Sequence, residues 1–168
     1  MEAAFTCLLQ KTEGETEARV NYQNPFAPLK SEKKEAEELL SSLGVNRDGE
    51  LRLGRFHDTV FLVSPHFAVP KGARLVRGGV AAIRVEEKRL EPLHGAALCL
   101  KKGECPRTVN FAADSEEVQR YLRGEQLSKE TDFRGYGVIA ADGYPLGLIK
   151  ASGGAIKNHY PKGLRLLK

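Results

Sequence analysis

Apolar residues recur every three or four positions in one stretch of the first half of the chain. They share one helical face: Ala36, Leu39, Leu40 and Leu43. Such spacing is typical of an amphipathic helix that buries one side. Ser31 is placed to cap the start of this helix, and Gly44 supplies the left-handed residue on which many helices end. The pattern therefore predicts an acidic helix over residues 31–43.

Two shorter helices are predicted further along. Asp114 and Glu117 have the spacing of a capping box, and the helix that they begin ends at Gly124. Its expected buried residues are Val118, Tyr121 and Leu122. Residues 92–100 are a weaker candidate behind Pro92, because a glycine within the stretch lowers its helix propensity.

Most of the other apolar residues occur in short alternations separated by Gly, Pro and Asp, which is typical of strands. Between residues 50 and 85 the apolar pairs are Leu51/Leu53, Val60/Leu62 and Leu75/Val76. Later, residues 137–141 and 145–150 flank Asp142-Gly143, a hairpin turn sequence, with an offset expected from Tyr144-Pro145. Gly153-Gly154 predicts another turn, which leads into a further strand.

The start of the chain is expected to be a strand followed by a linker. Residues 2–10 are a short apolar run, and residues 11–30 are polar with two prolines. Together these patterns predict an α+β protein with short helices, whose second half is rich in β-strands or forms a small barrel.

The composition is that of a globular protein. The chain has 168 residues, of which 41% are hydrophobic and 29% charged, so a wholly disordered protein is excluded. Every apolar run is shorter than the roughly 20 residues that span a bilayer, and no signal peptide is visible, so we expect no membrane contact. The three cysteines (Cys7, Cys99 and Cys105) are too few for a disulfide framework, which favours the cytoplasm. A single methionine, Met1, suits a fragment of a longer protein.

Charge is distributed unevenly. Residues 1–50 carry 6 Lys and Arg against 10 Asp and Glu, whereas residues 51–168 carry 20 against 12. After Asp142 the chain has no acidic residue. A polyanion would be attracted mainly to the C-terminal part, although a solvated basic surface explains the charge equally simply.

No catalytic or metal-binding set can be assembled from the spacing. Cys99 and Cys105 lack the Cys-x-x-Cys separation of a zinc site. The chain contains neither GxGxxG nor GxxxxGK[ST], and its serines lack the sequence of a nucleophile elbow. The residues thus predict a segment that is not itself an enzyme and binds no metal or cofactor.

The chemistry is densest in residues 157–165, which combine cations with an aromatic ring and an imidazole on a proline-containing turn. Lysine and arginine neutralise phosphates, Tyr160 or His159 can stack on a base, and Asn158 can bind a base edge. The competing interpretation is that Tyr160 and Pro161 close a barrel and leave the cations in solvent.

These residues carry a resemblance to a known family. Residues 135–138 (GYGV), 142–147 (DGYPLG), Lys150 and 157–165 (KNHYPKGLR) resemble the C-terminal RNA-binding domain of bacterial Sun-type RNA cytosine-5 methyltransferases. The closing nine residues match the family's pattern throughout. Less specifically, residues 121–125 are similar to a helix end of PUA-like domains, residues 77–92 to the family's intermediate region, and residues 2–11 to the last strand of its methyltransferase domain.

The resemblance implies a PUA-like pseudo-barrel preceded by a smaller α/β region. It places the end of a methyltransferase domain and a linker in residues 1–30, the intermediate region in 31–108 and the RNA-binding domain in 109–168. The family transfers methyl groups with two cysteines and S-adenosylmethionine. Here only Thr6-Cys7 reproduces one of its dipeptides, without the surrounding motif, so no catalytic role is carried over.

The expected function is therefore that of the RNA-binding part of an rRNA cytosine-5 methyltransferase, which holds RNA for a catalytic domain outside this chain. Its expected partners are RNA, ribosomal rather than transfer RNA, and that catalytic domain. The residues expected to bind phosphates are Lys150, Lys157, Lys162 and Arg165, and those expected to make closer contacts are Asn158, His159 and Tyr160. The alternatives are a protein-interaction module that docks the catalytic domain or a ribosomal protein, and an enzyme whose pocket the sequence does not reveal.

Overall fold

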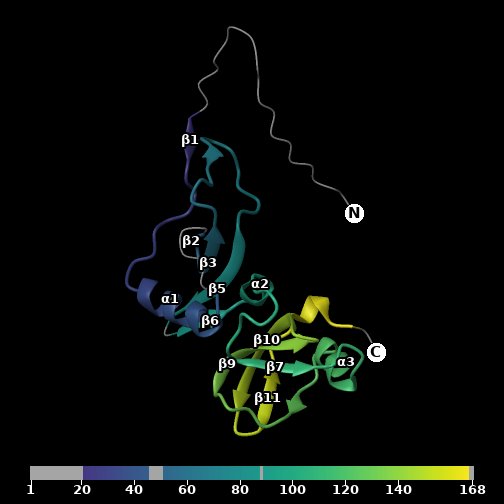
Figure 1. Cartoon of the computed structure of the whole chain (residues 1–168). Coiled ribbons are helices and arrows are strands. Elements are labelled where there is room, and N and C mark those ends of the chain that lie inside the picture. The colour runs from purple at the N-terminus through teal and green to yellow at the C-terminus, as the bar shows by residue number, and fades with distance from the viewer. Residues whose placement is uncertain (1–20, 46–50, 88, 167–168) are drawn as a thin grey trace.

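The computed structural model describes residues 21–45, 51–87 and 89–166. Figure 1 shows two β-sheets along an elongated molecule, with a small two-stranded ribbon at the end far from the C-terminal sheet. In chain order the elements are β1 (Tyr22–Gln23), α1 (Lys33–Ser42), β2 (Arg52–Phe56), β3 (Thr59–Val63), β4 (Val69–Pro70), β5 (Val80–Glu86), β6 (Arg89–Pro92), α2 (His94–Leu98), β7 (Thr108–Phe111), α3 (Glu116–Leu122), β8 (Leu127–Ser128), β9 (Gly135–Ala141), β10 (Tyr144–Ser152), β11 (Ala155–Asn158) and the 3₁₀ turn η1 (Lys162–Leu164). None of the helices in these ranges is long and apolar enough to cross a membrane.

The first sheet is an antiparallel meander in the order β2-β3-β5-β6. Beyond it, β1 pairs with β4 to form the two-stranded ribbon. Phe26 anchors the chain between ribbon and sheet, because its ring contacts Phe56, Phe61 and Phe67 at centroid distances of 6.3, 5.3 and 5.5 Å. The sequence predicts a linker over residues 11–30, of which 11–20 lie outside the described residues. In the remainder, Tyr22 and Gln23 pair with β4, and Ala27 pairs with Arg55 of β2. The prediction missed this because Phe26 stands alone among polar residues and prolines.

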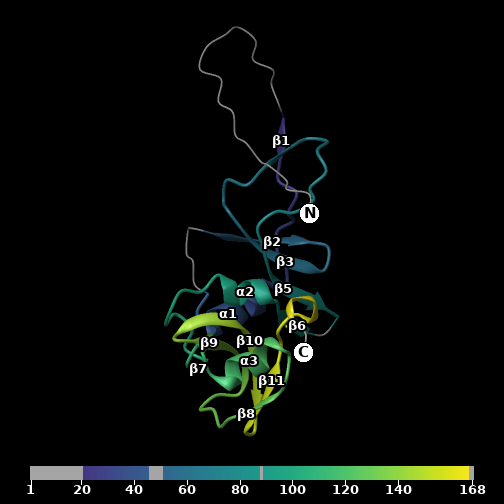
Figure 2. The ribbon, with the colours of Figure 1, turned by 90° about the vertical axis from the view of Figure 1, so that its right-hand side faces the viewer.

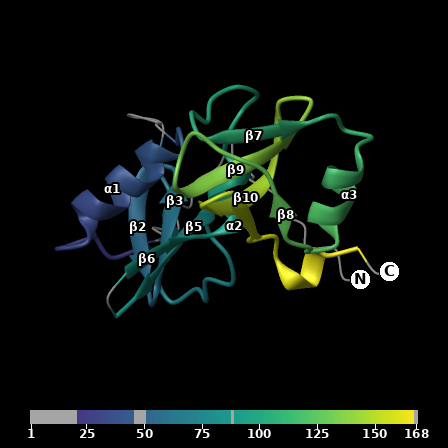
Figure 3. The ribbon, with the colours of Figure 1, turned by 90° about the horizontal axis from the view of Figure 1, so that it is seen from below.

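The second sheet has the order β7-β9-β10-β11-β8, with β7 parallel to β9 and the other pairs antiparallel. Asp142 and Gly143 form the predicted two-residue turn, with φ angles of +49° and +84°, as a type I′ hairpin requires. The offset loop expected from Tyr144-Pro145 is absent here, because Tyr144 pairs directly with Ala141; the irregularity is instead a bulge within β10, between Pro145 and Gly147. Seen from below in Figure 3, this sheet curls, and α3 lies at its far side.

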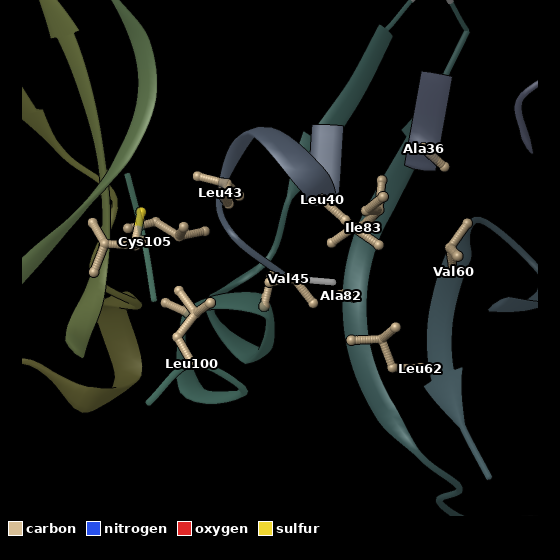
Figure 4. Close-up of a cluster of buried hydrophobic side chains, with 14 of the residues drawn as sticks. Ala36, Leu40, Leu43, Val45, Val60, Leu62, Ala82, Ile83, Leu100 and Cys105 are labelled. Carbon is tan, nitrogen blue, oxygen red and sulfur yellow. The ribbon is translucent and has the colours of Figure 1, made fainter. Parts of the chain in front are cut away.

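One hydrophobic core joins the two sheets (Figure 4). It contains Leu40 of α1, Val60 of β3, Ile83 of β5 and, from the second sheet, Val138 and Leu148. The helix α2 packs against both β5 and β10 (Figure 3). A smaller core between the second sheet and α3 contains Val109, Tyr121, Leu127, Ile139, Ile149 and Ile156. The two halves are therefore packed as one body.

The helix ends confirm the predicted glycines and correct the predicted caps. Gly44 and Gly124 have φ angles of +84° and +83° and end α1 and α3, and each helix closes with the paired backbone bonds of a Schellman motif. Ser31 does not cap α1, whose N-cap is Glu32. Ser115, not Asp114, caps α3, because its hydroxyl accepts a bond from the Val118 amide.

The remaining sequence predictions have mixed outcomes. The strands around Leu51/Leu53 and Val60/Leu62 and the short helix behind Pro92 are present. Leu75 and Val76 lie in a loop instead of a strand, because Gly72, Gly78 and Gly79 turn the chain on either side of them. The strand predicted over residues 2–10, with Cys7, lies outside the described residues. The α+β class with a β-rich second half is confirmed.

Candidate nucleic-acid interface

Three side chains form a row across the second sheet. Lys150 of β10 lies directly opposite Lys157 of β11 on one side and Tyr136 of β9 on the other. Residues directly opposite one another project from the same face of a sheet. The Lys150 Nζ lies 4.9 Å from the centre of the Tyr136 ring, a cation–π geometry. We call Tyr136, Lys150 and Lys157 the sheet row.

Both lysines of the sheet row are exposed, and neither forms an ion pair with any described residue. Like charges directly opposite each other destabilise a sheet. A fold that keeps this pair therefore gains no stability from it, and the pair presents two positive charges to solvent side by side.

The strand β6 borders the sheet row. Arg89 binds Glu86 at 2.7 Å and Glu91 at 2.9 Å. Burial and then the charge of Glu91 raise the pKa of the Tyr136 hydroxyl, so this tyrosine stays neutral. The acidic groups near the row are thus already occupied by Arg89 and do not neutralise the two lysines.

His159 lies beside the sheet row and contacts Tyr136. Its ring meets the ring of Tyr136 edge to face at 5.4 Å, and its buried Nε2 has no hydrogen-bond partner among the described residues. Burial, then the charge of Lys157 and to a smaller extent that of Lys150, lower the pKa of His159, while the charge of Glu91 opposes them. The imidazole is therefore neutral near pH 7 and adds no charge to the surface.

Asn158 is engaged within the fold. Its Nδ2 donates to the carbonyl oxygens of Tyr121 at 2.8 Å and Glu125 at 2.9 Å, and its Oδ1 accepts from the Tyr160 amide at 2.7 Å. Both of its side-chain N–H groups are used. In the structure this side-chain amide joins β11 to α3. Its predicted contact with a base edge stays a prediction.

Tyr160 packs inward. Its ring contacts His94 at 5.4 Å and Tyr121 at 5.3 Å. Burial raises the pKa of the Tyr121 hydroxyl, which remains protonated and donates to the Leu148 carbonyl at 3.0 Å. Tyr160 is only partly exposed, and its surroundings match the interpretation in which Tyr160 and Pro161 close the sheet.

The last two predicted residues follow in the C-terminal segment. Lys162 is exposed on η1. The guanidinium of Arg165 donates to the Tyr160 carbonyl at 3.3 and 3.4 Å and lies against Gly124, where any Cβ would collide with it. The backbone amide of Leu166 then donates to Leu122 at 3.0 Å. Residues 158–166 therefore pack along α3 and are hydrogen-bonded to it.

The seven predicted residues thus fall into two groups. Lys150 and Lys157 lie on the sheet row, and His159 contacts its Tyr136. Asn158, Tyr160 and Arg165 are engaged in contacts around α3, and Lys162 is exposed in the same segment. Tyr136 was missed. The two-residue turn at 153–154 could have placed Lys150 opposite Lys157 from sequence, because Ser152 pairs with Ala155. An unbulged hairpin would have placed Gly135 opposite Lys150, so only the bulge brings Tyr136 there.

Among residues 21–45, 51–87 and 89–166 no three His, Cys, Asp or Glu side chains cluster in the way that a metal ion needs. Cys105 is buried in the shared core. The chemistry of this surface is therefore that of exposed cations beside an aromatic ring.

The curled five-stranded sheet, with α3 clasped to it, defines a PUA-like domain. Residues 108–166 match the family described as Methyltransferase RsmF PUA domain. The C-terminal part of this chain is thus similar to the PUA domain of RsmF methyltransferases, and the resemblance to the C-terminal region of Sun-type RNA cytosine-5 methyltransferases is confirmed.

Similar proteins cover more of the chain than this domain. The chain is 29% identical over 145 residues to the ribosomal RNA small subunit methyltransferase F of Cronobacter sakazakii. It is 28% identical over 144 residues to the protein of that name from Escherichia coli O139:H28, and 27% identical over 143 residues to that of Erwinia tasmaniensis. Each alignment covers 83% of this chain. The chain spans 29–30% of the length of these relatives.

Proposed function

We propose that this chain is the RNA-binding part of a ribosomal RNA cytosine-5 methyltransferase of the cytoplasm, and that it holds structured RNA for a catalytic domain outside the chain. The observation that carries the proposal is the opposed pair Lys150–Lys157 on a domain of the RsmF PUA type. Two adjacent cations beside an aromatic ring fit a phosphate backbone with a base next to it.

The sheet row and Lys162 are the proposed RNA contacts. The lysines neutralise phosphates, and the partly exposed Tyr136 ring, steadied by His159, offers a surface for a base. Recognition of structured RNA depends mainly on its shape and backbone. Ribosomal RNA is the proposed substrate of the parent enzyme, as the names of the relatives suggest.

Methyl transfer from S-adenosylmethionine is assigned to the catalytic domain, because the described residues do not fit that cofactor. Within the described part of the chain, the one strand–helix–parallel strand unit is β7–α3–β9. The loop between β7 and α3 is Ala112-Ala113-Asp114-Ser115 and contains no glycine. A nucleotide-type cofactor needs a glycine-rich turn at that place, so that the backbone can approach it closely.

The test is binding of the chain to a small-subunit rRNA transcript over a range of salt concentrations. The variant is Lys150→Gln/Lys157→Gln, and the matched control is Lys33→Gln/Lys34→Gln on the acidic helix α1. Loss of two phosphate contacts would reduce the slope of log affinity against log salt by about 1.4 to 1.8. Equal slopes for variant and control would contradict the proposed contacts. If the unsubstituted chain does not bind RNA at low salt, the protein-docking alternative is favoured.

A further inference from the structure

A second cationic surface lies between β4 and β5. Its charged residues are Lys71, Arg74 and Arg77, all exposed. No acidic residue occurs between Asp58 and Glu86, and none of the three cations forms an ion pair with a described residue. We call residues 71–79 the cationic loop.

The cationic loop is held at both ends. At its start the Lys71 amide donates to the Asn21 carbonyl at 2.7 Å, next to the β1–β4 pairing. At its end Gly78 is buried so tightly that a Cβ would lie 2.7 Å from the Phe67 ring, and a Cβ on Gly79, whose φ is +68°, would strike the Leu62 carbonyl. Both ends of the loop are therefore fixed before any ligand arrives, which lowers the entropic cost of binding.

The side chains of the cationic loop differ in their exposure to solvent. Leu75 turns toward Gly78 and is partly buried. Its neighbours Arg74 and Val76 are exposed, Val76 by 89%. The loop thus uses one apolar residue as an anchor and displays the cations around it.

An exposed aromatic ring lies beside the loop. Tyr22 of β1 is 65% exposed and pairs with Pro70, the residue that precedes Lys71. Guanidinium groups bind phosphates through paired hydrogen bonds, and an exposed tyrosine ring provides a stacking surface for a base. This combination fits a nucleic acid better than an acidic peptide, which has no flat ring to place on Tyr22.

The cationic loop lies far from the sheet row, so a ligand bound to both would have to span the molecule. Figures 1 and 2, two views at right angles, both show the β1–β4 ribbon at the end of the molecule opposite the second sheet. We propose that the cationic loop with Tyr22 is a second RNA contact, which binds the backbone of the same RNA away from the sheet row. The inference rests on the proposed function for the identity of its ligand. Two linked contacts on one RNA increase affinity by raising the local concentration of the second.

The experiment compares Lys71→Gln/Arg74→Gln/Arg77→Gln with the control Lys30→Gln/Lys33→Gln/Lys34→Gln, both in the full chain. Binding to a small-subunit rRNA transcript is measured over a salt series, and circular dichroism checks that each variant is folded. The loop variant is expected to reduce the salt slope by about 2 to 3, while the control leaves it unchanged. Tyr22→Ala is expected to keep the slope and to weaken binding of a single-stranded RNA oligonucleotide by roughly fivefold or more.

The outcomes separate this inference from the proposed function. If the loop variant binds like the control while Lys150→Gln/Lys157→Gln is impaired, the second contact is overturned and the first stands. If the loop variant alone is impaired, the second contact stands and the sheet row is overturned. If both variants bind like their controls, both are overturned, and the loop becomes a candidate for an acidic protein partner.

Discussion

Lys150 and Lys157 lie directly opposite each other on β10 and β11, although the two ammonium groups repel. Lys150 offsets part of this cost by lying over the Tyr136 ring. A pair that weakens the sheet and faces solvent is a candidate for function, because stability gives no reason to keep it. It also allows a test in which stability and binding change in opposite directions.

Lys157→Glu is expected to raise the free energy of unfolding by about 0.2 to 1 kcal/mol, because it replaces a cross-strand repulsion with an attraction. The same change is expected to weaken RNA binding, since it places a negative charge on the sheet row. Urea unfolding and a binding titration measure the two effects. Lys30→Glu is the control, because Lys30 is exposed and forms no ion pair with a described residue. Parallel losses of stability and affinity in Lys157→Glu would contradict the assignment.

Gly147→Ala is expected to destabilise the fold by about 1 to 3 kcal/mol. A Cβ at this position would lie 2.5 Å from the Tyr121 hydroxyl and 3.0 Å from the His94 ring. Gly163→Ala is the control, because no atom lies within 4 Å of its Cβ position.

Adding Tyr121→Phe to Gly147→Ala is expected to recover part of the loss, since it removes the oxygen that the new methyl group meets. Tyr121→Phe alone costs about 1 kcal/mol or more, because it leaves the Leu148 carbonyl without its hydrogen bond. The four proteins form a double-mutant cycle read by urea unfolding. Strictly additive losses would show that the two sites are not in steric contact.

Asn158→Ala is expected to lower the free energy of unfolding by about 2 to 3 kcal/mol, since it removes three hydrogen bonds between β11, α3 and Tyr160. Under conditions where the variant is fully folded, its RNA affinity should match that of the unsubstituted chain. Asn158→Asp keeps the acceptor but loses both donors, so it should be destabilised as well. A stable Asn158→Ala with reduced affinity would instead assign Asn158 to RNA recognition.

Stability is expected to fall as the pH decreases from 7.5 to 5.5. Burial lowers the pKa of His94 and of His159 in the folded chain, so the unfolded chain binds more protons once the pH passes below about 6.5, the ordinary histidine value. The loss begins there and levels off below the folded pKa values. Glu32 and Glu125 also have lowered pKa values, but they affect stability only at more acid pH.

Replacing each histidine separately identifies the source of this dependence. His94→Gln and His159→Gln should each reduce the difference in unfolding free energy between pH 7.5 and 5.5. His66→Gln, on the exposed surface, is the control. A pH dependence that persists when both buried histidines are replaced would rule out this origin.

Local chemistry made several parts of the fold predictable. Glycines 44 and 124 end their helices as expected because the left-handed conformation is costly for other residues. Asp142-Gly143 and Gly153-Gly154 set two hairpins, and from them the opposed lysines follow. The tail motif was sufficient to find the resemblance that the match of residues 108–166 confirms.

Other features depend on contacts that no local pattern records. Phe26 is buried only because three phenylalanines from β2, β3 and the loop before β4 surround it. Tyr136 joins the sheet row only through the bulge after Pro145. Asn158 and Tyr160 have suitable chemistry for RNA but turn toward α3. The sequence pattern does not show this, because their partners lie more than thirty residues earlier in the chain.

The core that joins the two sheets has a mechanical consequence. Because Val138 and Leu148 pack with residues of α1, β3 and β5, the two sheets are held together by the protein interior. The cationic loop is attached to the first sheet at Gly78, which lies against Phe26 and Phe67. The chain would then bind an RNA whose backbone reaches the sheet row and the cationic loop at once more tightly than an RNA that reaches only one of them.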